Sequence, residues 1–201
     1  MSFSQEFWSW FSNPQPPRGI TLGSPPNLGD KAPSSEKLLL PDPQGKPVIL
    51  AFLRHCGCPF AEQTFRALRA GAAANKNIHF IAISHSSTSA TEKWVKDVGG
   101  SRENNSAPAV DVIVDEQCEI YTQWGLGATS LAHVLNPSAL YAVYALGREK
   151  GIWNKPTESG SRWQRSGAWA VDEKGVVIWG HAAERADDTI DVEEAVKALE
   201  R

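Results

Sequence analysis

The sequence predicts an α/β domain built around a central sheet, because short apolar segments alternate with amphipathic ones along the chain. Residues 47–53 (PVILAFL) are nearly all apolar, which is typical of a strand buried on both faces. Apolar segments at 78–83 and 110–114 predict two more strands, and a helical pattern precedes each of them. Strands separated by helices pair in parallel, so these three segments predict the parallel part of the sheet.

Helices and a closing hairpin account for most of the remaining chain. Residues 61–74 predict the first helix, and Ser89 with Glu92 forms a capping-box pattern that predicts the start of a second. Residues 168–172 and 176–180 predict two strands joined by a glycine-containing turn. Further helices are predicted at 117–125, 137–148 and 191–200.

The N-terminal part of the chain differs in composition from the rest. Residues 3–11 (FSQEFWSWF) predict a short aromatic helix that packs on the domain, with a dimer contact or a pocket lid as alternatives. Residues 12–34 are rich in Pro, Gly, Ser and Asn and predict an irregular linker, followed by a short strand at 36–40. We therefore expect an N-terminal extension over 1–28 and one domain over 29–201.

Composition limits the partners and the compartment that we expect. The 201 residues carry a formal net charge of −3, which argues against nucleic acid as a partner. No apolar run approaches the roughly 20 residues that cross a bilayer, and the N-terminus lacks the pattern of a secretory signal. Three cysteines leave at least one thiol unpaired, which favours a reducing, cytoplasmic location. The cysteines and histidines show no zinc-type spacing, so we expect neither a metal nor a cofactor.

A cluster of cysteines lies where the first buried strand meets the first helix. Pro59 fits the first helical position, so Cys58 is the predicted N-cap. Unpaired N–H groups and the helix dipole at that end favour an anion, and the thiolate is the form that attacks peroxides and disulfides. Arg54 and His55 lie just upstream and add positive charge. The sequence therefore predicts a redox site of Cys58, Cys56, Arg54 and His55.

The segment VILAFLRHCGCPFAEQTFRAL resembles the active-site stretch of the peroxiredoxin-like AhpC/TSA group within the thioredoxin superfamily. The segments GDKAP near residue 30, VDEQCEIYTQWGLG and SGAWAVDEKGVVIWGHAAERADD extend the resemblance over about residues 29–200. The resemblance implies a thioredoxin-like fold, with a central mixed β-sheet flanked by helices and a helical insertion before the closing β-hairpin. It also implies a thiol-dependent oxidoreductase that reduces a peroxide or disulfide.

The sequence departs from that group's pattern at positions that concern how the oxidised cysteine is reduced again. Ala61 stands where the group's Cys-x-x-Cys has its second cysteine, and Gly167 stands where thioredoxins place a cis-proline. Oxidised Cys58 would then be resolved by Cys56, by the distant Cys118, or by an external thiol such as glutathione.

Two other functions are compatible with the same residues. The first is a non-redox enzyme or small-molecule binder, in a biosynthetic pathway for example, with a pocket lined by Trp124, Trp153, Trp163 and Trp169. The second is a redox-sensing or binding module that uses residues 3–11 as its contact. The expected partners are a small-molecule substrate or an external thiol reductant, with a homodimer as a further option and no membrane contact.

Two histidines lie at the ends of predicted strands. His85 is in a serine-rich stretch at the carboxyl end of a strand, where open α/β sheets bind ligands, although a plain loop is the alternative. His181 ends the last strand, and we expect it to lie outside the site because most exposed histidines have no specific role.

Overall fold

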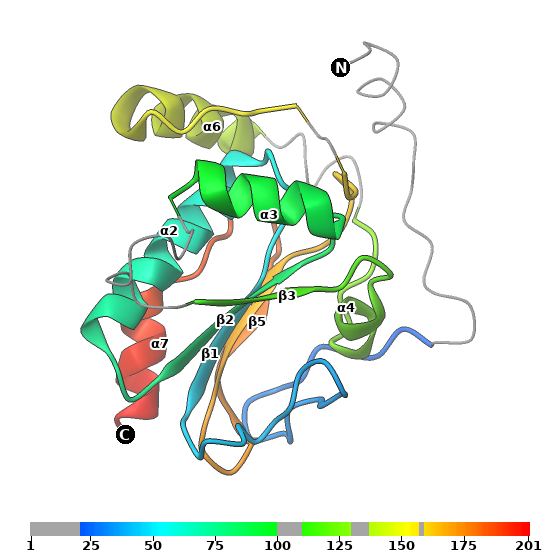
Figure 1. Cartoon of the computed structure of the whole chain (residues 1–201), viewed down its shortest axis with the longest axis vertical. Helices are drawn as coiled ribbons and strands as arrows, with labels where there is room; N and C mark the ends of the chain where they lie inside the picture. The colour runs from blue at the N-terminus through cyan, green and yellow to red at the C-terminus, as the bar shows by residue number, and fades with distance from the viewer. Residues whose placement is uncertain (1–20, 100–109, 130–136, 157–158) are drawn as a thin grey trace.

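The computed structural model describes residues 21–99, 110–129, 137–156 and 159–201, which form a five-stranded mixed sheet with helices on both faces (Figure 1). The strand order is β3-β2-β1-β4-β5; β1, β2 and β3 are parallel, whereas β4 and β5 are antiparallel to their neighbours. The strands are β1 Val48–Phe52, β2 His79–Ser84, β3 Asp111–Val114, β4 Gly167–Val171 and β5 Val177–Ala182. The predicted parallel strands and closing hairpin are confirmed.

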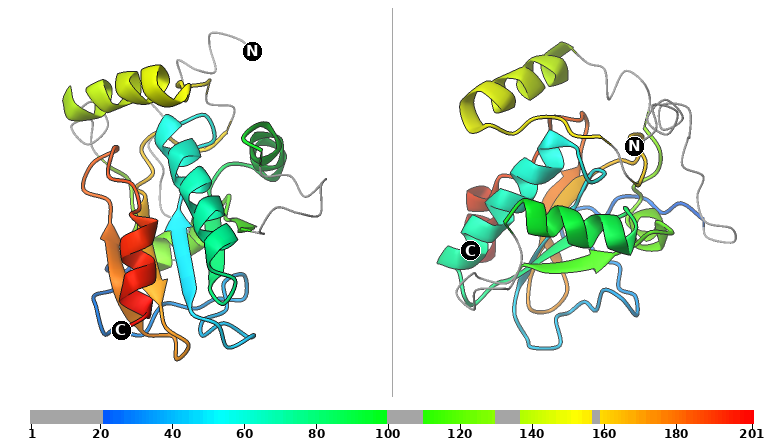
Figure 2. Two further views of the ribbon diagram at one scale, coloured as in Figure 1. Left: turned by 90° about the vertical axis from the view of Figure 1, so that its left-hand side faces the viewer. Right: turned by 45° about the horizontal axis from the view of Figure 1, so that its top comes forward.

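The two parallel crossovers place their helices on the same face of the sheet, as right-handed connections require. Figure 2 shows α2 beside α7 on this face, and Figure 1 shows α6 lying above the start of α2. The helices are α2 Pro59–Ala74, α3 Thr88–Asp97, α4 Glu119–Gln123, α6 Pro137–Lys150 and α7 Val192–Leu199. In the described part of the chain, no helix is both long and apolar enough to cross a bilayer.

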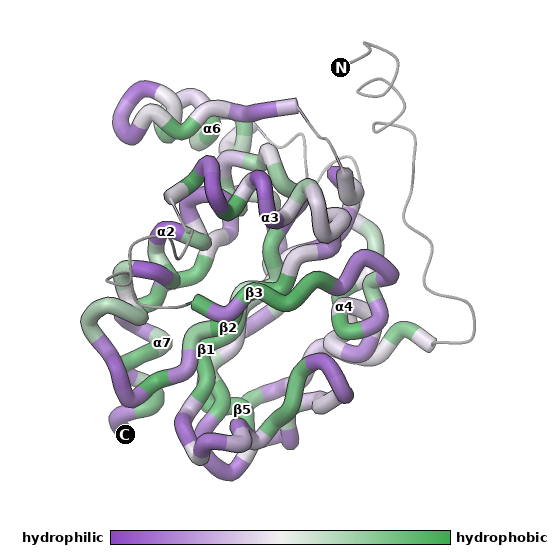
Figure 3. The backbone as a smooth tube through the Cα atoms, viewed as in Figure 1, coloured by the Kyte–Doolittle hydropathy of each residue, from purple (hydrophilic) through white to green (hydrophobic). Residues whose placement is uncertain are grey.

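The central strand β1 supplies side chains to both layers of the core, because successive residues of a strand point to opposite faces. Ile49 and Ala51 belong to the cluster packed under α2, α6 and α7. Leu50 and Phe52 belong to a second cluster, which lies against α4 and the segment 32–40. All five residues of β1 are buried, and the strands carry the most hydrophobic part of the backbone trace in Figure 3.

Two local predictions are wrong. Residues 36–40 form no strand, because Ser34 and Ser35 bind the same backbone groups that a neighbouring strand would need. The hydroxyl of Ser34 accepts from the Leu40 N–H at 3.0 Å, and the Ser35 backbone exchanges hydrogen bonds with Leu38. Helix α3 is capped by the hydroxyl of Ser87, which accepts from Ala90 N–H, and not by the predicted capping box.

The topology brings several polar segments to one edge of the sheet. The carboxyl ends of β1, β2 and β5 and the amino end of β4 all lie there, since β4 runs antiparallel to its neighbours. Residues 54–58, 84–87, 166–167 and 181–183 follow or precede these strand ends. The cysteine cluster is therefore at the edge where such sheets bind ligands.

The predicted aromatic helix at 3–11 and most of the extension over 1–28 lie outside the described residues.

Candidate functional site

Cys58 occupies the N-cap position of α2, as the sequence predicts, and Pro59 takes the first helical position. The residue is buried, its N–H donates to His55 O at 3.0 Å, and its carbonyl accepts from Ala61 N–H at 3.1 Å. Its side chain makes no capping hydrogen bond to the helix. The sulfur is therefore held at the positive end of the helix dipole and is not used to cap the backbone.

Arg54 is a buried cation on the same loop. Its Nη2 donates to the carbonyl of Arg162 at 2.7 Å, whereas Nε and Nη1 are buried and have no hydrogen-bond partner in the described part of the chain. Burying a guanidinium without an anionic partner is costly. The arrangement gains stability when an anion forms beside it.

His55 is also buried, and its Nδ1 lies 3.2 Å from the carbonyl oxygen of Cys56. Burial, together with the charges of Arg54 and Arg162, lowers the pKa of this imidazole well below its usual 6.5. His55 is therefore neutral near pH 7, and the positive charge at the site comes from the arginines.

Cys56 lies in a small group of hydroxyls that sequence reasoning did not identify. Its Sγ is 3.9 Å from both Ser84 Oγ and Thr91 Oγ1, and its N–H donates to Ser86 Oγ at 3.1 Å. Ser84 and Thr91 bind each other at 2.9 Å. The serine-rich stretch after the second predicted strand could have indicated the serines of this group. Nothing in the sequence indicated Thr91, because it comes from a helix face.

Cys118 is separated from the other two cysteines by the sheet. It packs against the core cluster on the α4 face, whereas Cys56 and Cys58 belong to the cluster on the α2 face. Burial, and secondarily the neighbouring Asp115, raises the pKa of the Cys118 thiol to about 12. This thiol is neutral at physiological pH and is in no position to resolve Cys58.

A strap, residues 151–156, covers the loop between the two cysteines. Lys155 N–H donates to Gly57 O at 2.9 Å, and Lys155 Nζ pairs with the buried Glu62 at 3.1 Å. Gly57 has φ +109°, and a Cβ there would lie 2.7 Å from Pro156 O. Only glycine permits this close approach, so strap and cysteine loop fit together as one unit. The sequence predicts a loop here but gives no sign that it packs on the cysteine loop.

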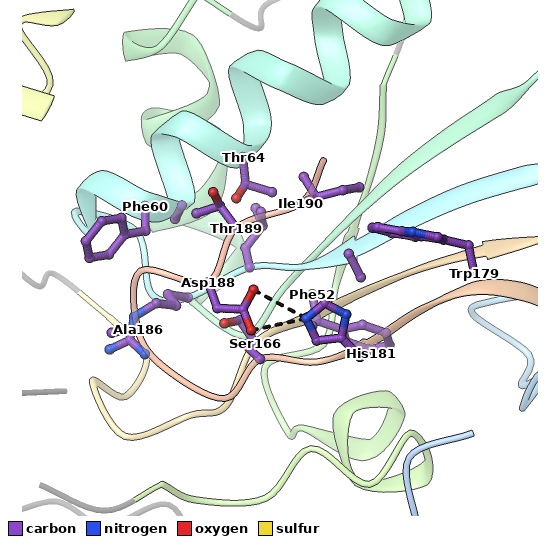
Figure 4. A pocket seen from close by; sticks show the side chains of 16 residues that line it. Phe52, Phe60, Thr64, Ser166, Trp179, His181, Ala186, Asp188, Thr189 and Ile190 are labelled. Atoms are coloured by element: carbon purple, nitrogen blue, oxygen red, sulfur yellow. Dashed lines mark hydrogen bonds and ion pairs between the residues drawn. The ribbon is translucent and has the colours of Figure 1, made fainter. Parts of the chain in front are cut away.

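A cavity adjoins the first turn of α2. We call it the Ala61 cavity; it is lined in part by Arg54, Phe60, Ala61, Thr64, Ser166, His181 and Asp188. Figure 4 shows the His181–Asp188 pair on the β5 side, where Nε2 lies 3.1 Å from the carboxylate, and Thr64 on the helix side. The expectation that His181 lies outside the site is wrong, because β5 ends at the same sheet edge as β1.

The predicted tryptophan-lined pocket is not formed by the residues that the structure describes. Trp124 and Trp169 pack on each other, with ring centroids 4.9 Å apart, and on Phe52 in the α4-side core. Trp153 is half exposed. A cavity beside Cys56 is lined in part by Trp94, and the Ala61 cavity is lined in part by Trp179.

His85 is buried in a hydrogen-bond network behind the cysteine loop. Its Nε2 lies 3.1 Å from both the N–H and the carbonyl oxygen of Ser161, and its Nδ1 lies 3.4 Å from the Tyr121 hydroxyl. That hydroxyl lies 2.7 Å from Leu53 O and 2.8 Å from Ile83 O, at the ends of β1 and β2. Burial lowers the pKa of His85 from 6.5 to about 4. Its role in the structure is to hold the sheet edge.

Across the described ranges, no group of three or more His, Cys, Asp or Glu residues is arranged to hold a metal ion.

The fold and the N-cap cysteine define a thioredoxin-like protein. The model of the AhpC/TSA antioxidant enzyme family matches residues 64–185, more than half of the chain, and the protein belongs to that family. The match begins beyond Cys58. No curated protein matches the sequence.

Solved structures share the fold at low sequence identity. A thiol peroxidase from Chromobacterium violaceum has a TM-score of 0.54 and 14% identity, with 90% of each chain covered. Peroxiredoxin 6 of Arenicola marina has a TM-score of 0.59 and 13% identity, covering 87% of this chain and 72% of that one. A yeast mitochondrial 1-Cys peroxiredoxin, whose thiol is resolved via glutathione/thioredoxin systems, has a TM-score of 0.51 and 13% identity, covering 87% and 75%.

The lowered pKa of His85 predicts a loss of stability in mild acid. Between pH 6.5 and 4 the unfolded chain takes up a proton at this position that the folded chain does not, so stability falls as pH decreases through this window. We expect His85 to account for roughly 3 kcal/mol of the loss, because each pH unit between the two pKa values is worth about 1.4 kcal/mol. The free energy of unfolding, measured with urea at pH values from 7 to 4, gives the size of this loss.

The variant His85→Gln keeps an acceptor for Ser161 and cannot titrate, so its stability should fall less over this range, although His55 and, near pH 4, Asp42 still contribute in the same direction. Equal losses in both proteins would contradict the assignment.

The strap predicts that removing its ion pair exposes the thiols. We expect Lys155→Met to raise the rate at which N-ethylmaleimide modifies Cys58 and Cys56 severalfold, measured by peptide mass spectrometry. Removing a nearby cation would by itself slow the reaction of a thiolate, so an increase in the modification rate reports greater access to the thiols. Lys150 is an exposed lysine at the end of α6, so Lys150→Met is the control and should leave the modification rates unchanged.

Proposed function

We propose that this protein is a thiol-dependent peroxidase in which the Cys58 thiolate attacks a peroxide. The observation that carries the proposal is the joint placement of Cys58 at the helix N-cap and of Arg54, a buried cation with two nitrogens unpartnered among the described residues, on one loop. Helix dipole and guanidinium both favour negative charge at that position. Family membership and the shared fold are consistent with this chemistry.

The proposed first step oxidises sulfur by two electrons. The thiolate sulfur bonds to one peroxide oxygen while the O–O bond breaks, and the departing oxygen leaves as water or an alcohol after taking a proton. Cys58 becomes a sulfenic acid. The neutral His55 lies next to Cys56 and fits a role in holding the loop, because it carries no charge near pH 7.

An external thiol is the proposed resolver. Cys118 is on the other face of the sheet, and a disulfide between Cys56 and Cys58 would close a short, strained ring. Similarity in fold to a 1-Cys peroxiredoxin that uses glutathione/thioredoxin systems supports this route. The three free cysteines also support a reducing compartment such as the cytoplasm. A Cys56–Cys58 disulfide is the second route, and the cysteine variants below separate the two.

The binder alternative is not favoured, because the four tryptophans that would have lined its pocket do not form one in the described part of the chain.

We expect Cys58→Ser to lower hydrogen peroxide consumption with dithiothreitol by at least about 100-fold, since the nucleophile is lost. Cys118→Ser should retain the wild-type rate. With peroxide and no added thiol, the wild-type protein should keep a sulfenic acid on Cys58 if an external thiol is the resolver, and should form a Cys56–Cys58 disulfide that Cys56→Ser lacks if Cys56 is the resolver. Dimedone labelling and mass spectrometry identify the oxidised residue. Full activity of Cys58→Ser would overturn the proposal.

Restoring the second cysteine should change the resolving step. An N-cap side chain reaches toward the third helical residue, which here is Ala61, and Ala61 borders a cavity. We expect Ala61→Cys treated with peroxide to form a disulfide between Cys58 and the introduced thiol, detected by non-reducing peptide mapping. Ala70→Cys, exposed farther along the same helix, should form none. A persistent sulfenic acid in Ala61→Cys would show that the two positions do not face each other.

A further inference from the structure

A second cavity lies between α3, the cysteine loop and the strap, and it shares no described lining residue with the Ala61 cavity. We call it the α3 cavity. Its volume is about 170 Å³, and a cavity of about 150 Å³ already holds a molecule of the size of benzene. Residues 90, 93, 94 and 97 of α3 form one wall, because residues three and four apart share a helix face. The space is therefore large enough for a small organic molecule.

Trp94 gives this cavity an apolar wall that carries one hydrogen-bond donor. Its side chain is 5% exposed and packs on Phe65, with ring centroids 5.2 Å apart. The indole N–H is buried and has no hydrogen-bond partner among the described residues, which is costly. Because Trp94 lines the cavity, an oxygen atom of a ligand bound there can accept from this N–H. Ala90 and Pro156 add apolar surface for the rest of the ligand.

Positive charge is in excess around the α3 cavity. Lys93 and Lys155 belong to its lining, and Asp97 is the acidic residue among the described lining residues. Lys155 pairs with Glu62, but Glu62 also pairs with Arg66, so one carboxylate offsets only one of these two cations. The remaining positive charge favours an anionic ligand over a neutral one.

We infer that the α3 cavity binds a small organic acid, with its carboxylate on the indole N–H of Trp94 and its apolar body against Ala90 and Pro156. Aromatic carboxylates of the size of benzoate combine the required charge, hydrogen-bond acceptor and apolar surface. The inference is independent of the proposed peroxidase function, because it uses neither Cys58 nor Arg54.

A ligand in this cavity also acts on the strap. The strap supplies Lys155 and Pro156 to the wall, so lifting the strap removes part of the binding site. A ligand that binds only the closed form shifts the equilibrium toward that form. Cys56 lines the same cavity. An organic acid therefore slows reagents that attack Cys56, because it occupies the space beside this residue and holds the strap closed.

The test measures protection of Cys56. In the full-length variant with Cys58→Ser and Cys118→Ser, Cys56 is the remaining cysteine, and intact-mass spectrometry follows its modification by N-ethylmaleimide at constant ionic strength. We expect benzoate to slow this reaction in a saturable manner. Benzamide keeps the ring without the charge, and acetate keeps the charge without the ring. Each should need a concentration about tenfold higher than benzoate for the same protection.

Two variants of α3 locate the site. Trp94→Phe keeps an aromatic ring and removes the N–H, so it should raise the half-protecting benzoate concentration about tenfold. Lys93→Met changes an exposed side chain and should raise that concentration about threefold at low salt. Lys96→Met is the matched control, since Lys96 is an exposed lysine of the same helix that does not line the cavity. Equal protection by benzamide, or benzoate protection that neither Trp94→Phe nor Lys93→Met weakens, would overturn the inference.

Discussion

The cysteine loop depends on the end of β1 being held in place, and the Tyr121 hydroxyl provides that hold. It lies within hydrogen-bond distance of the carbonyls of Leu53, just after β1, and of Ile83, near the end of β2, and His85 joins it to the segment around Ser161. The same hydroxyl is buried among apolar groups, so losing either partner leaves polar atoms unsatisfied. Helix α4 thus fixes, from the opposite face of the sheet, where the reactive loop begins.

Arg54 imposes a second constraint on this edge. Its charge is buried, and only one of its three nitrogens is bonded in the described residues. A buried guanidinium with unpaired nitrogens costs folding stability, and groups of this kind are common where a protein trades stability for activity.

Much of the fold could be predicted from the sequence, because continuous apolar strands, Pro59 and the hairpin glycine are local signals with direct physical causes. Residues 36–40 show where local signals fail: two serine side chains compete with strand pairing there. The placement of Cys58 was predictable for the same local reason. The strap, the Thr91 contact and the His181–Asp188 pair were not, because each depends on segments 30 or more residues from the cysteine loop meeting at a sheet edge.

The close fit of Gly57 under the strap has a consequence for how often the thiols meet solutes. Both cysteines are only 6% exposed, and Lys155 and Pro156 of the strap line a cavity together with Cys56, so opening of the strap increases access to the cysteine loop. The frequency of encounters with solutes then depends on a local opening equilibrium. A peroxide rate that saturates with concentration would be the kinetic signature of such gating, even if the chemical step is fast.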